Sequence, residues 1–440
     1  MRVLFLILLL LLQTGCTSYL VVSGGEVKQD KVQEIKHGLA EMRGLDFTSE
    51  VPIEVKSKAA IKKYLEASLI RDYGEEKLKN ISIAYGKLGL LPEGLDLKEA
   101  LLNFYADQVV AFYDPKAKKL FLPAEWVGGM ANNAVQFLAQ RDIMGEMVLA
   151  HELTHALQEQ HFSIGEKLDI LGNDDKTLAL RCVVEGDALL AGFGYLFGFL
   201  DEENITQVND SVVGNIDETR STLSGEIPVA ILEQLLFQYY GGVSFVSRYL
   251  NERGWLGINR IYSDPPLSTE QVLHPEKYID NPDPPTRISL GALSLLFPAG
   301  WTEIEDNILG ELMVRVLFTE FFSKKKGKSV ADGWDGDRFI AFRDGDKTSF
   351  IWAAVWDSVD DAEEFTDNYQ KLLSIKYRSS EPNNAHSYIE QRGLQTIVVE
   401  GLENHHTRKY IDRIWQEMKL EEAPFKPPFP PIPTRPALPL

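Results

Sequence analysis

The feature that most constrains this chain is the sequence HELTH at residues 151–155, an HExxH motif. Apolar residues recur around it at helical spacing, so we expect a helix over about 140–161. Four residues turn an α-helix by about 400°, which places His151 and His155 on one face, within reach of a single ion. Glu152 lies about 100° from His151, beside the ion, where it can accept a proton from water.

The pair of imidazoles favours zinc over hard cations, which prefer oxygen ligands. The alternative is a buried histidine pair where two helices cross. That alternative leaves Glu152 between the two rings without a charge partner, which is costly in a buried helix. We therefore predict that His151 and His155 bind Zn²⁺ and that Glu152 is a general base.

A catalytic zinc site requires a third protein ligand, and two residues compete for that role. His161 has the metzincin spacing, but Gln158 replaces the glycine that breaks the helix in that pattern. On a continuous helix His161 points about 280° away from His151. Glu185 lies among apolar neighbours in a second helical stretch, about 176–199, and an antiparallel partner helix can present its carboxylate. We favour Glu185, with His161 as the alternative.

Residues 151–162 (HELTHALQEQHF) and 184–188 (VEGDA) resemble a group of uncharacterised bacterial HExxH proteins, often lipoproteins, similar to gluzincin-type zinc metallopeptidases. The resemblance implies a zincin-like fold with zinc bound by His151, His155 and Glu185. It supplies no substrate. Further similar segments lie at 109–123, 237–246 (with Gln238 in place of proline), 265–278, 310–312 and 333–337.

Other residues are candidates for positioning a substrate. A hairpin expected within 109–123 would lie at the edge of the cleft, where its second strand could pair with a peptide. His274, in a proline-rich loop over 263–287, and Tyr239 are candidate oxyanion donors, although a loop histidine more often caps a carbonyl. Asp187 could orient a ligand histidine or face away from it.

The N-terminus reads as an export signal. Arg2 precedes an apolar run over 3–12, which is too short for a permanent membrane helix. Gly15-Cys16 then matches the end of a bacterial lipoprotein signal, although Gln13 stands where leucine is usual. We expect removal of residues 1–15 and an exported protein, anchored at the cell envelope by acyl chains on Cys16. The alternative is an ordinary signal peptide that leaves Cys16 unmodified.

Composition excludes several classes of protein. With 45 Lys+Arg against 65 Asp+Glu, the net charge of −20 argues against nucleic acid as a partner. The hydrophobic fraction of 44% and charged fraction of 25% are typical of a globular chain. Two cysteines exclude a disulfide-stapled scaffold, and we expect Cys182 to be a small buried residue.

We predict an α+β protein with a mainly helical, zincin-like metallopeptidase domain and a small edge hairpin at 29–290. A tether at 16–28 precedes it, an α+β domain follows at 291–422, and a proline-rich tail occupies 423–440. In the C-terminal domain we expect a small sheet with helices on one face. Its tryptophans are expected in the core; they are Trp334, Trp352 and Trp356.

Two functions are compatible with these features. The first is a cell-envelope zinc peptidase that hydrolyses a peptide or protein substrate, with Glu152 as the base. The alternative is a noncatalytic zinc-binding lipoprotein that serves as a binding or assembly module. The intact Glu152 favours the first, because a structural zinc site needs no base. Neither reading specifies an oligomeric state.

Overall fold

The structure, a computed structural model, covers most of the chain between residues 21 and 421. The expected signal peptide, Cys16 and the proline-rich tail lie outside the described residues. Among the described residues, no helix combines the length and apolar character that crossing a bilayer requires. The described residues are 21–23, 26–108, 111–124, 142–170, 172–291, 293, 297, 300–377, 387–402 and 404–421.

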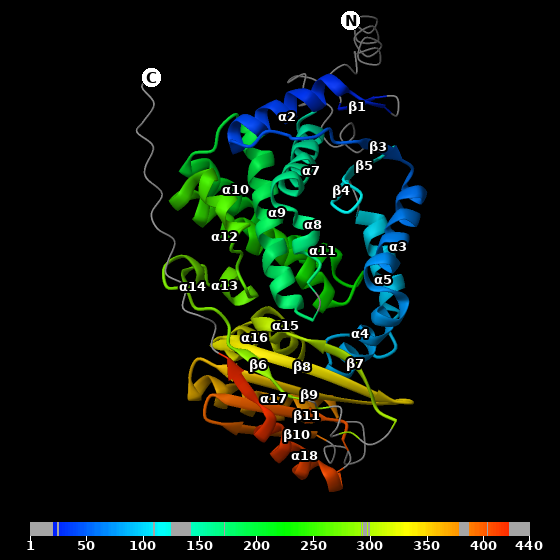
Figure 1. Ribbon diagram of the computed structural model, residues 1–440, viewed down its shortest axis with the longest axis vertical. Coiled ribbons are helices and arrows are strands. Elements are labelled where there is room, and N and C mark those ends of the chain that lie inside the picture. Colours follow the sequence, from blue (N-terminus) through cyan, green and yellow to red (C-terminus); the bar gives the residue numbers. More distant parts are fainter. Residues whose placement is uncertain are drawn as a thin grey trace, which may run out of the picture. The chain divides into compact units, whose positions relative to one another are not determined.

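The protein is α+β, with a mainly helical N-terminal region and an antiparallel sheet in the C-terminal region (Figure 1). It forms two compact units made of discontinuous segments. Helix α9 (Asp174–Phe197) is one continuous helix that contributes to both. The domain boundary expected at residue 290 stays a prediction. The first unit contains the described residues of Met1–Tyr64, Ala106–Gly165 and Ala188–Asn204, and the second those of Leu65–Tyr105, Glu166–Asp187 and Ile205–Leu440.

The first unit is built around helix α7 (Ile143–Phe162), which carries the HExxH motif as expected. Helix α2 (Gln29–Arg43) packs against it. A three-stranded sheet has the order β3-β5-β4, with β5 parallel to β3 and antiparallel to β4. Other elements of this unit are the short strands β1 (Val22–Ser23) and β2 (Glu26–Val27), together with β3 (Ile53–Lys56), β4 (Phe112–Asp114), β5 (Lys119–Pro123) and the start of α3 (Lys58–Tyr73).

In the second unit, glycines allow two long helices to approach closely. A methyl group at Gly186 of α9 would lie 2.3 Å from the carbonyl oxygen of Gly242, so neither position tolerates a side chain. Gly242 lies in α12 (Val229–Ile261). The backbone of this helix leaves helical geometry at Gly254, with φ 62° and ψ −177°, so α12 is kinked there.

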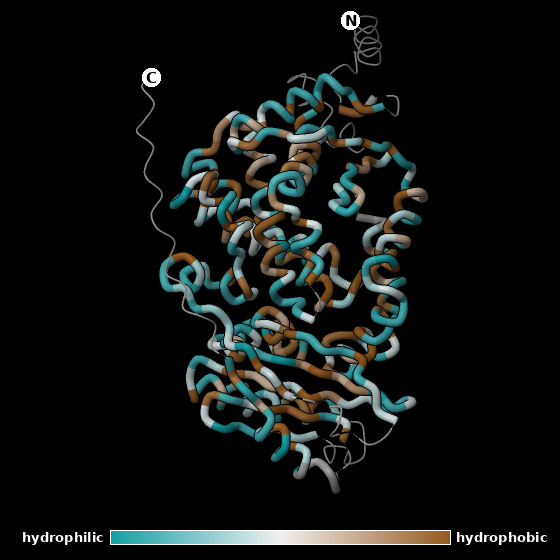
Figure 2. Tube along the Cα trace, in the orientation of Figure 1, coloured by the Kyte–Doolittle hydropathy of each residue, from teal (hydrophilic) through white to brown (hydrophobic). Residues whose placement is uncertain are grey.

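The C-terminal region contains a five-stranded antiparallel sheet in the order β10-β11-β9-β8-β7, and hydrophobic residues recur along its strands (Figure 2). Phe365 and Tyr369 of α17 pack edge-on against Trp352 on one face. Helix α18 covers the opposite face, where Ile414 joins the core with Ile351. The expectation of helices on one face was therefore wrong, while the buried tryptophans were predicted correctly. The elements of this sheet and its cover are β7 (Thr302–Asn307), α15 (Gly310–Phe321), α16 (Lys324–Ala331), β8 (Trp334–Asp344), β9 (Lys347–Trp356), α17 (Val359–Lys376), β10 (Ser387–Arg392), β11 (Gln395–Glu400) and α18 (Asn404–Glu417).

Several short elements were not predicted. The proline-rich loop over 263–287 contains α13 (Thr269–Leu273), which begins where the Ser268 hydroxyl accepts a hydrogen bond from the backbone N–H of Gln271. The S-x-x-Q spacing of a capping box was the available signal. The remaining elements, which lie wholly or partly in the second unit, are α4 (Glu75–Leu88), α5 (Leu97–Gln108), α8 (Ile164–Lys167), α10 (Glu202–Gly214), α11 (Ile216–Leu223), α14 (Glu276–Ile279), β6 (Arg287–Ser289) and β12 (Lys419–Glu421).

Candidate metal centre

Local sequence fixes the start and the end of helix α7. The Asp142 carboxylate caps the helix by accepting a hydrogen bond from the Gly145 N–H at 3.0 Å. The helix is unbroken as far as Phe162 and ends where Ser163 adopts a left-handed conformation. Helical geometry therefore holds through the whole motif, and His151 and His155 project from one face as expected.

The two histidine rings meet in the way that shared ligation of one ion requires. Their Nε2 atoms lie 3.1 Å apart. Two nitrogens on a tetrahedral zinc ion at about 2.0–2.1 Å are separated by about 3.3 Å. The Nδ1 atom of His155 lies 2.9 Å from the side-chain oxygen of Gln158, which can only accept a hydrogen bond. Nδ1 therefore carries the proton, and the lone pair of Nε2 is available to a metal.

Glu185 completes a group of three possible ligands. One ligand atom each of His151, His155 and Glu185 lies within 4.8 Å of the others. Helix α9 packs closely on α7 at Gly192, where a methyl group would lie 3.3 Å from the carbonyl oxygen of Met147. Seven residues turn a helix by about 700°, so Glu185 lies on the same face of α9 as Gly192. This neutral-imidazole and carboxylate donor set fits zinc, and the group could hold a metal ion.

The Glu152 carboxylate is oriented by the neighbouring sheet. It is buried and accepts a hydrogen bond of 2.7 Å from the backbone N–H of Tyr113 in β4. The sequence leads us to expect the second strand of the hairpin, β5, at the cleft edge. Instead β5 is the central strand, paired on both sides, and β4 is an edge strand of this sheet. The outer edge of β4 faces the predicted base, because its Tyr113 N–H is bonded to Glu152.

The remaining predicted residues have other partners. His161 lies on the unbroken helix α7, and its Nε2 atom is 2.7 Å from the carbonyl oxygen of Asp46. The structure therefore brings Glu185, and not His161, to the histidine pair. The Asp187 carboxylate accepts a hydrogen bond of 2.7 Å from the Tyr262 hydroxyl. Cys182 is fully buried, as expected, and burial raises the pKa of its thiol.

His274 is held by an acidic residue in its own unit. Its Nε2 atom lies 3.1 Å from the Glu311 carboxylate, and this hydrogen bond raises the pKa of His274 above its ordinary value. Tyr239 is partly exposed on α12. Neither residue belongs to the group of possible metal ligands around His151, and their role as oxyanion donors stays a prediction.

A second carboxylate cluster needs no metal to balance its charge. Glu270, Asp283 and Asp357 surround the ammonium group of Lys277, which lies 2.6 Å, 3.1 Å and 2.8 Å from their respective carboxylates. The chain supplies the cation at this place itself. We therefore infer that this cluster stabilises the fold through its ion pairs with Lys277 and does not bind a metal.

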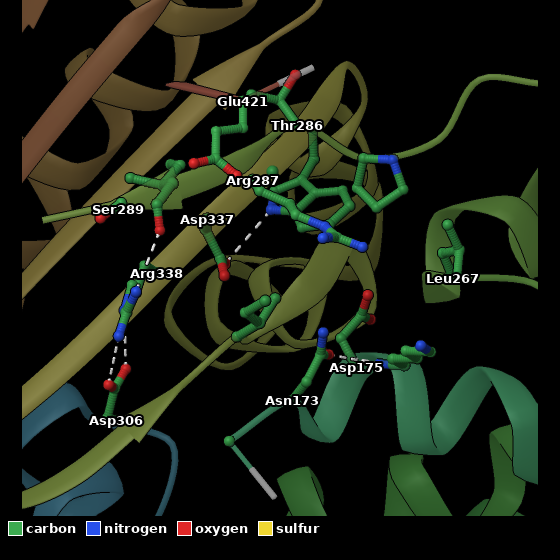
Figure 3. Close-up of a pocket in the computed structure, with 17 residues that line it drawn as sticks. Asn173, Asp175, Leu267, Thr286, Arg287, Ser289, Asp306, Asp337, Arg338 and Glu421 are labelled. Atoms are coloured by element: carbon green, nitrogen blue, oxygen red, sulfur yellow. Dashed lines mark hydrogen bonds and ion pairs between the residues drawn. The ribbon is translucent and has the colours of Figure 1, made fainter. Parts of the chain in front are cut away.

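A cavity of about 460 Å³ lies in the second unit, with Asp175 of α9 and Asp337 of β8 on its wall (Figure 3). Thr269 donates to Asp175 from both its N–H and its hydroxyl. Asp337 accepts hydrogen bonds from the indole N–H groups of Trp334 and Trp352, and burial raises its pKa to about 6. Donors from the protein itself supply hydrogen bonds to both carboxylates. None of the three possible metal ligands lines the cavity.

Two contributions to the centre were not foreseen. In the sequence, Gln158 serves only to exclude the metzincin pattern, whereas in the structure its side-chain oxygen holds the His155 ring. Its spacing of three residues from His155, on the same helix face, was the available signal. The backbone N–H of Tyr113 orients Glu152, and a backbone contact between residues 39 apart leaves no mark in the sequence.

Comparisons with known proteins add little to these assignments. Residues 298–409 match a family described as a domain of unknown function (DUF8575), which is less than half of the chain. No curated protein matches the chain. A solved protein from Chloroflexus aurantiacus, described as a "putative hydrolase with a novel fold", is 16% identical and covers 61% of this chain and 93% of its own. Its TM-score of 0.32 is too low to transfer a fold or an activity.

Proposed function

We propose that this protein is a zinc-dependent peptidase of gluzincin type, with His151, His155 and Glu185 as ligands. The observation that carries the proposal is the convergence of these three side chains beside a buried, oriented Glu152. A structural zinc site has four protein ligands, commonly including cysteine, whereas a catalytic site has three and leaves one position open. Among the residues that the structure describes, three possible ligands lie together beside a carboxylate, which supports a catalytic site.

The residues of the chain divide the work of hydrolysis. Zinc, when bound, supplies Lewis-acid chemistry, lowering the pKa of water and polarising a carbonyl. Gln158 keeps His155 in the tautomer whose Nε2 can bind. Glu152, held by the Tyr113 N–H, takes the proton of the attacking water and can return it to the leaving amine.

We also propose that the protein acts at the bacterial cell envelope, anchored by acyl chains on Cys16. The support is the sequence of the N-terminus, in which a short apolar run precedes Gly15-Cys16. The N-terminal peptide of protein purified from membranes tests this directly. A mass that corresponds to an acylated Cys16 supports the anchor, and an unmodified or absent Cys16 refutes it.

Replacing Glu152 by glutamine tests the mechanism. The amide keeps the shape of the side chain but cannot accept the proton, so turnover of a peptide library should fall by about 10²–10⁴-fold. Zinc content, measured by atomic emission, should stay at the wild-type level because Glu152 is not a ligand. Cleavage that persists in this variant would refute the mechanism. Zinc binding without any chelator-sensitive cleavage in the wild type would favour the noncatalytic binding module.

A further inference from the structure

Four large apolar side chains are exposed at one end of the helix pair that carries the possible metal ligands. Ile143 and Met144, in the first turn of α7, are 36% and 49% exposed. Phe197 and Phe199, at the end of α9 and just beyond it, are 45% and 60% exposed. We call these four residues the apolar end face. Exposing such side chains to water is unfavourable unless something covers them.

The two pairs lie at the same end because α7 and α9 are antiparallel. Gly192 of α9 lies beside the backbone of Met147 and His151. From that contact, Phe197 lies about 7.5 Å further along α9, and Ile143 lies about 6 Å back along α7 from Met147. Figure 1 shows the start of α7 and the end of α9 on the side of the first unit where α2 and β1 lie. The four side chains therefore belong to one region of the surface.

The described chain begins at this same place. The Val21 N–H donates a hydrogen bond of 3.2 Å to the Asp142 carboxylate, which also caps α7 immediately before Ile143. Val21 is fully buried, so this attachment is firm. Cys16 is only five residues before Val21 in the sequence. A span of five residues reaches at most about 18 Å, so acyl chains on Cys16 would bring a bilayer close to the apolar end face.

We propose that the apolar end face lies on the bilayer surface beside the lipid anchor. This inference rests on the proposed anchoring at Cys16. Apolar side chains that insert partly into the bilayer add to the affinity supplied by the acyl chains and fix the orientation of the protein on the membrane. The neighbouring residues Asp201, Glu202 and Glu203 are acidic, so contact with anionic lipids is disfavoured. The face fits an electrically neutral lipid surface.

This orientation restricts the substrate class. His151 lies eight residues after Ile143, which corresponds to at most about 12 Å along the helix axis. A metal held by His151 would therefore act close to the membrane surface. The substrates that fit are the membrane-proximal segments of polypeptides anchored in the same bilayer.

Single-cysteine labelling tests the orientation. The full-length protein, carrying Met144→Cys or Phe199→Cys and a polarity-sensitive fluorophore, is reconstituted into phosphatidylcholine vesicles that contain a lipid-borne quencher. Cys182 is fully buried, and the proposed acylation blocks the sulfur of Cys16, so the introduced cysteine is the reactive one. Ala117→Cys is the matched control in the same unit, because Ala117 is exposed in the turn between β4 and β5, where Pro115 lies beside Gly165 beyond the opposite end of α7. The labels at 144 and 199 should be quenched severalfold more than the label at 117.

Several outcomes would overturn the orientation. One is equal quenching at all three positions in protein that floats with the vesicles. Another is protection of the labels at 144 and 199 without vesicles at increasing protein concentration, which would assign the face to a second copy of the chain. A protein that does not float would overturn both the anchor and the orientation. The effect of Glu152→Gln on soluble peptides is independent of all of these results.

A functional variant tests the consequence for substrates. In Phe197→Ser/Phe199→Ser, cleavage of a soluble peptide library should proceed at the wild-type rate, because neither residue belongs to the proposed metal centre. Cleavage of the same library coupled to lipid through a short linker should fall severalfold. An equal rate on the tethered library would contradict the inference, while loss of both activities would show that the variant is misfolded and leave the labels as the deciding test.

Discussion

At the scale of single residues, hydrogen bonds to neighbours set the chemistry of the histidines. Gln158 fixes the proton of His155 on Nδ1, and Glu311 favours the protonated form of His274. One contact leaves a ring nitrogen available to a metal, and the other raises the pKa of the ring. The two effects differ because an amide oxygen is a neutral acceptor and a carboxylate is an anionic one.

Replacing Gln158 by leucine should weaken zinc binding by about 10–100-fold, as is usual when the partner of a ligand histidine is removed. Competition with a zinc-sensitive dye measures the affinity. Gln158→Glu keeps an acceptor at the same place and should bind zinc nearly as tightly as the wild type. Equal loss in both variants would mean that the Gln158 contact does not act through the His155 tautomer.

Replacing Glu311 by glutamine should lower the pKa of His274, which an NMR titration of the ring protons measures directly. The raised pKa in the folded protein means that the pair stabilises the fold below the ordinary histidine pKa of about 6.5. This stabilisation is lost as the pH rises through the raised pKa of His274. The wild type should therefore exceed Glu311→Gln in stability most clearly at acidic pH, and a constant difference would contradict the assignment.

At the scale of elements, close packing of helices positions the ligands. Glu185 reaches the histidines because α9 approaches α7 at Gly192 and α12 at Gly186. Each glycine removes the side chain that would separate the helix axes. The arrangement explains why a carboxylate 30 residues after His155 can share its ion.

Gly186→Ala should destabilise the fold by about 1–3 kcal/mol and weaken zinc binding, because the added methyl group overlaps the Gly242 carbonyl. Gly214→Ala is the matched control, since that helical glycine in α10 has open space around it. The control should be neutral or slightly stabilising. Denaturant unfolding and dye competition measure both effects. Unchanged zinc affinity in Gly186→Ala would show that helix spacing does not set the Glu185 position.

At the scale of the whole molecule, the possible metal centre and the matched domain of unknown function occupy different parts of the chain. Residues 298–409 carry that match, while the three possible ligands lie between 151 and 185. The comparison is therefore silent about the metal chemistry. The three ligands come from two separate helices, so a bound metal would link α7 to α9.

Zinc should therefore stabilise the folded protein. Free zinc at about 100 times its dissociation constant raises the free energy of unfolding by about 2.7 kcal/mol, provided that the unfolded chain does not bind it. Thermal unfolding with zinc and with a chelator measures the difference. His155→Ala should lose the response. A wild-type midpoint that is the same under both conditions would argue against a resident ion.

The sequence alone determined the helix at the motif and the convergence of His151 with His155, because four-residue spacing is a local property of a helix. It also indicated the second ligand helix and a small sheet in the C-terminal domain. Strand β7 has a weak apolar signal in the sequence because it buries Glu305, which pairs with Lys77, a partner 228 residues away. Only the tertiary structure decided that Glu185 and not His161 meets the histidine pair, since helix spacing depends on packing between residues that no local pattern connects.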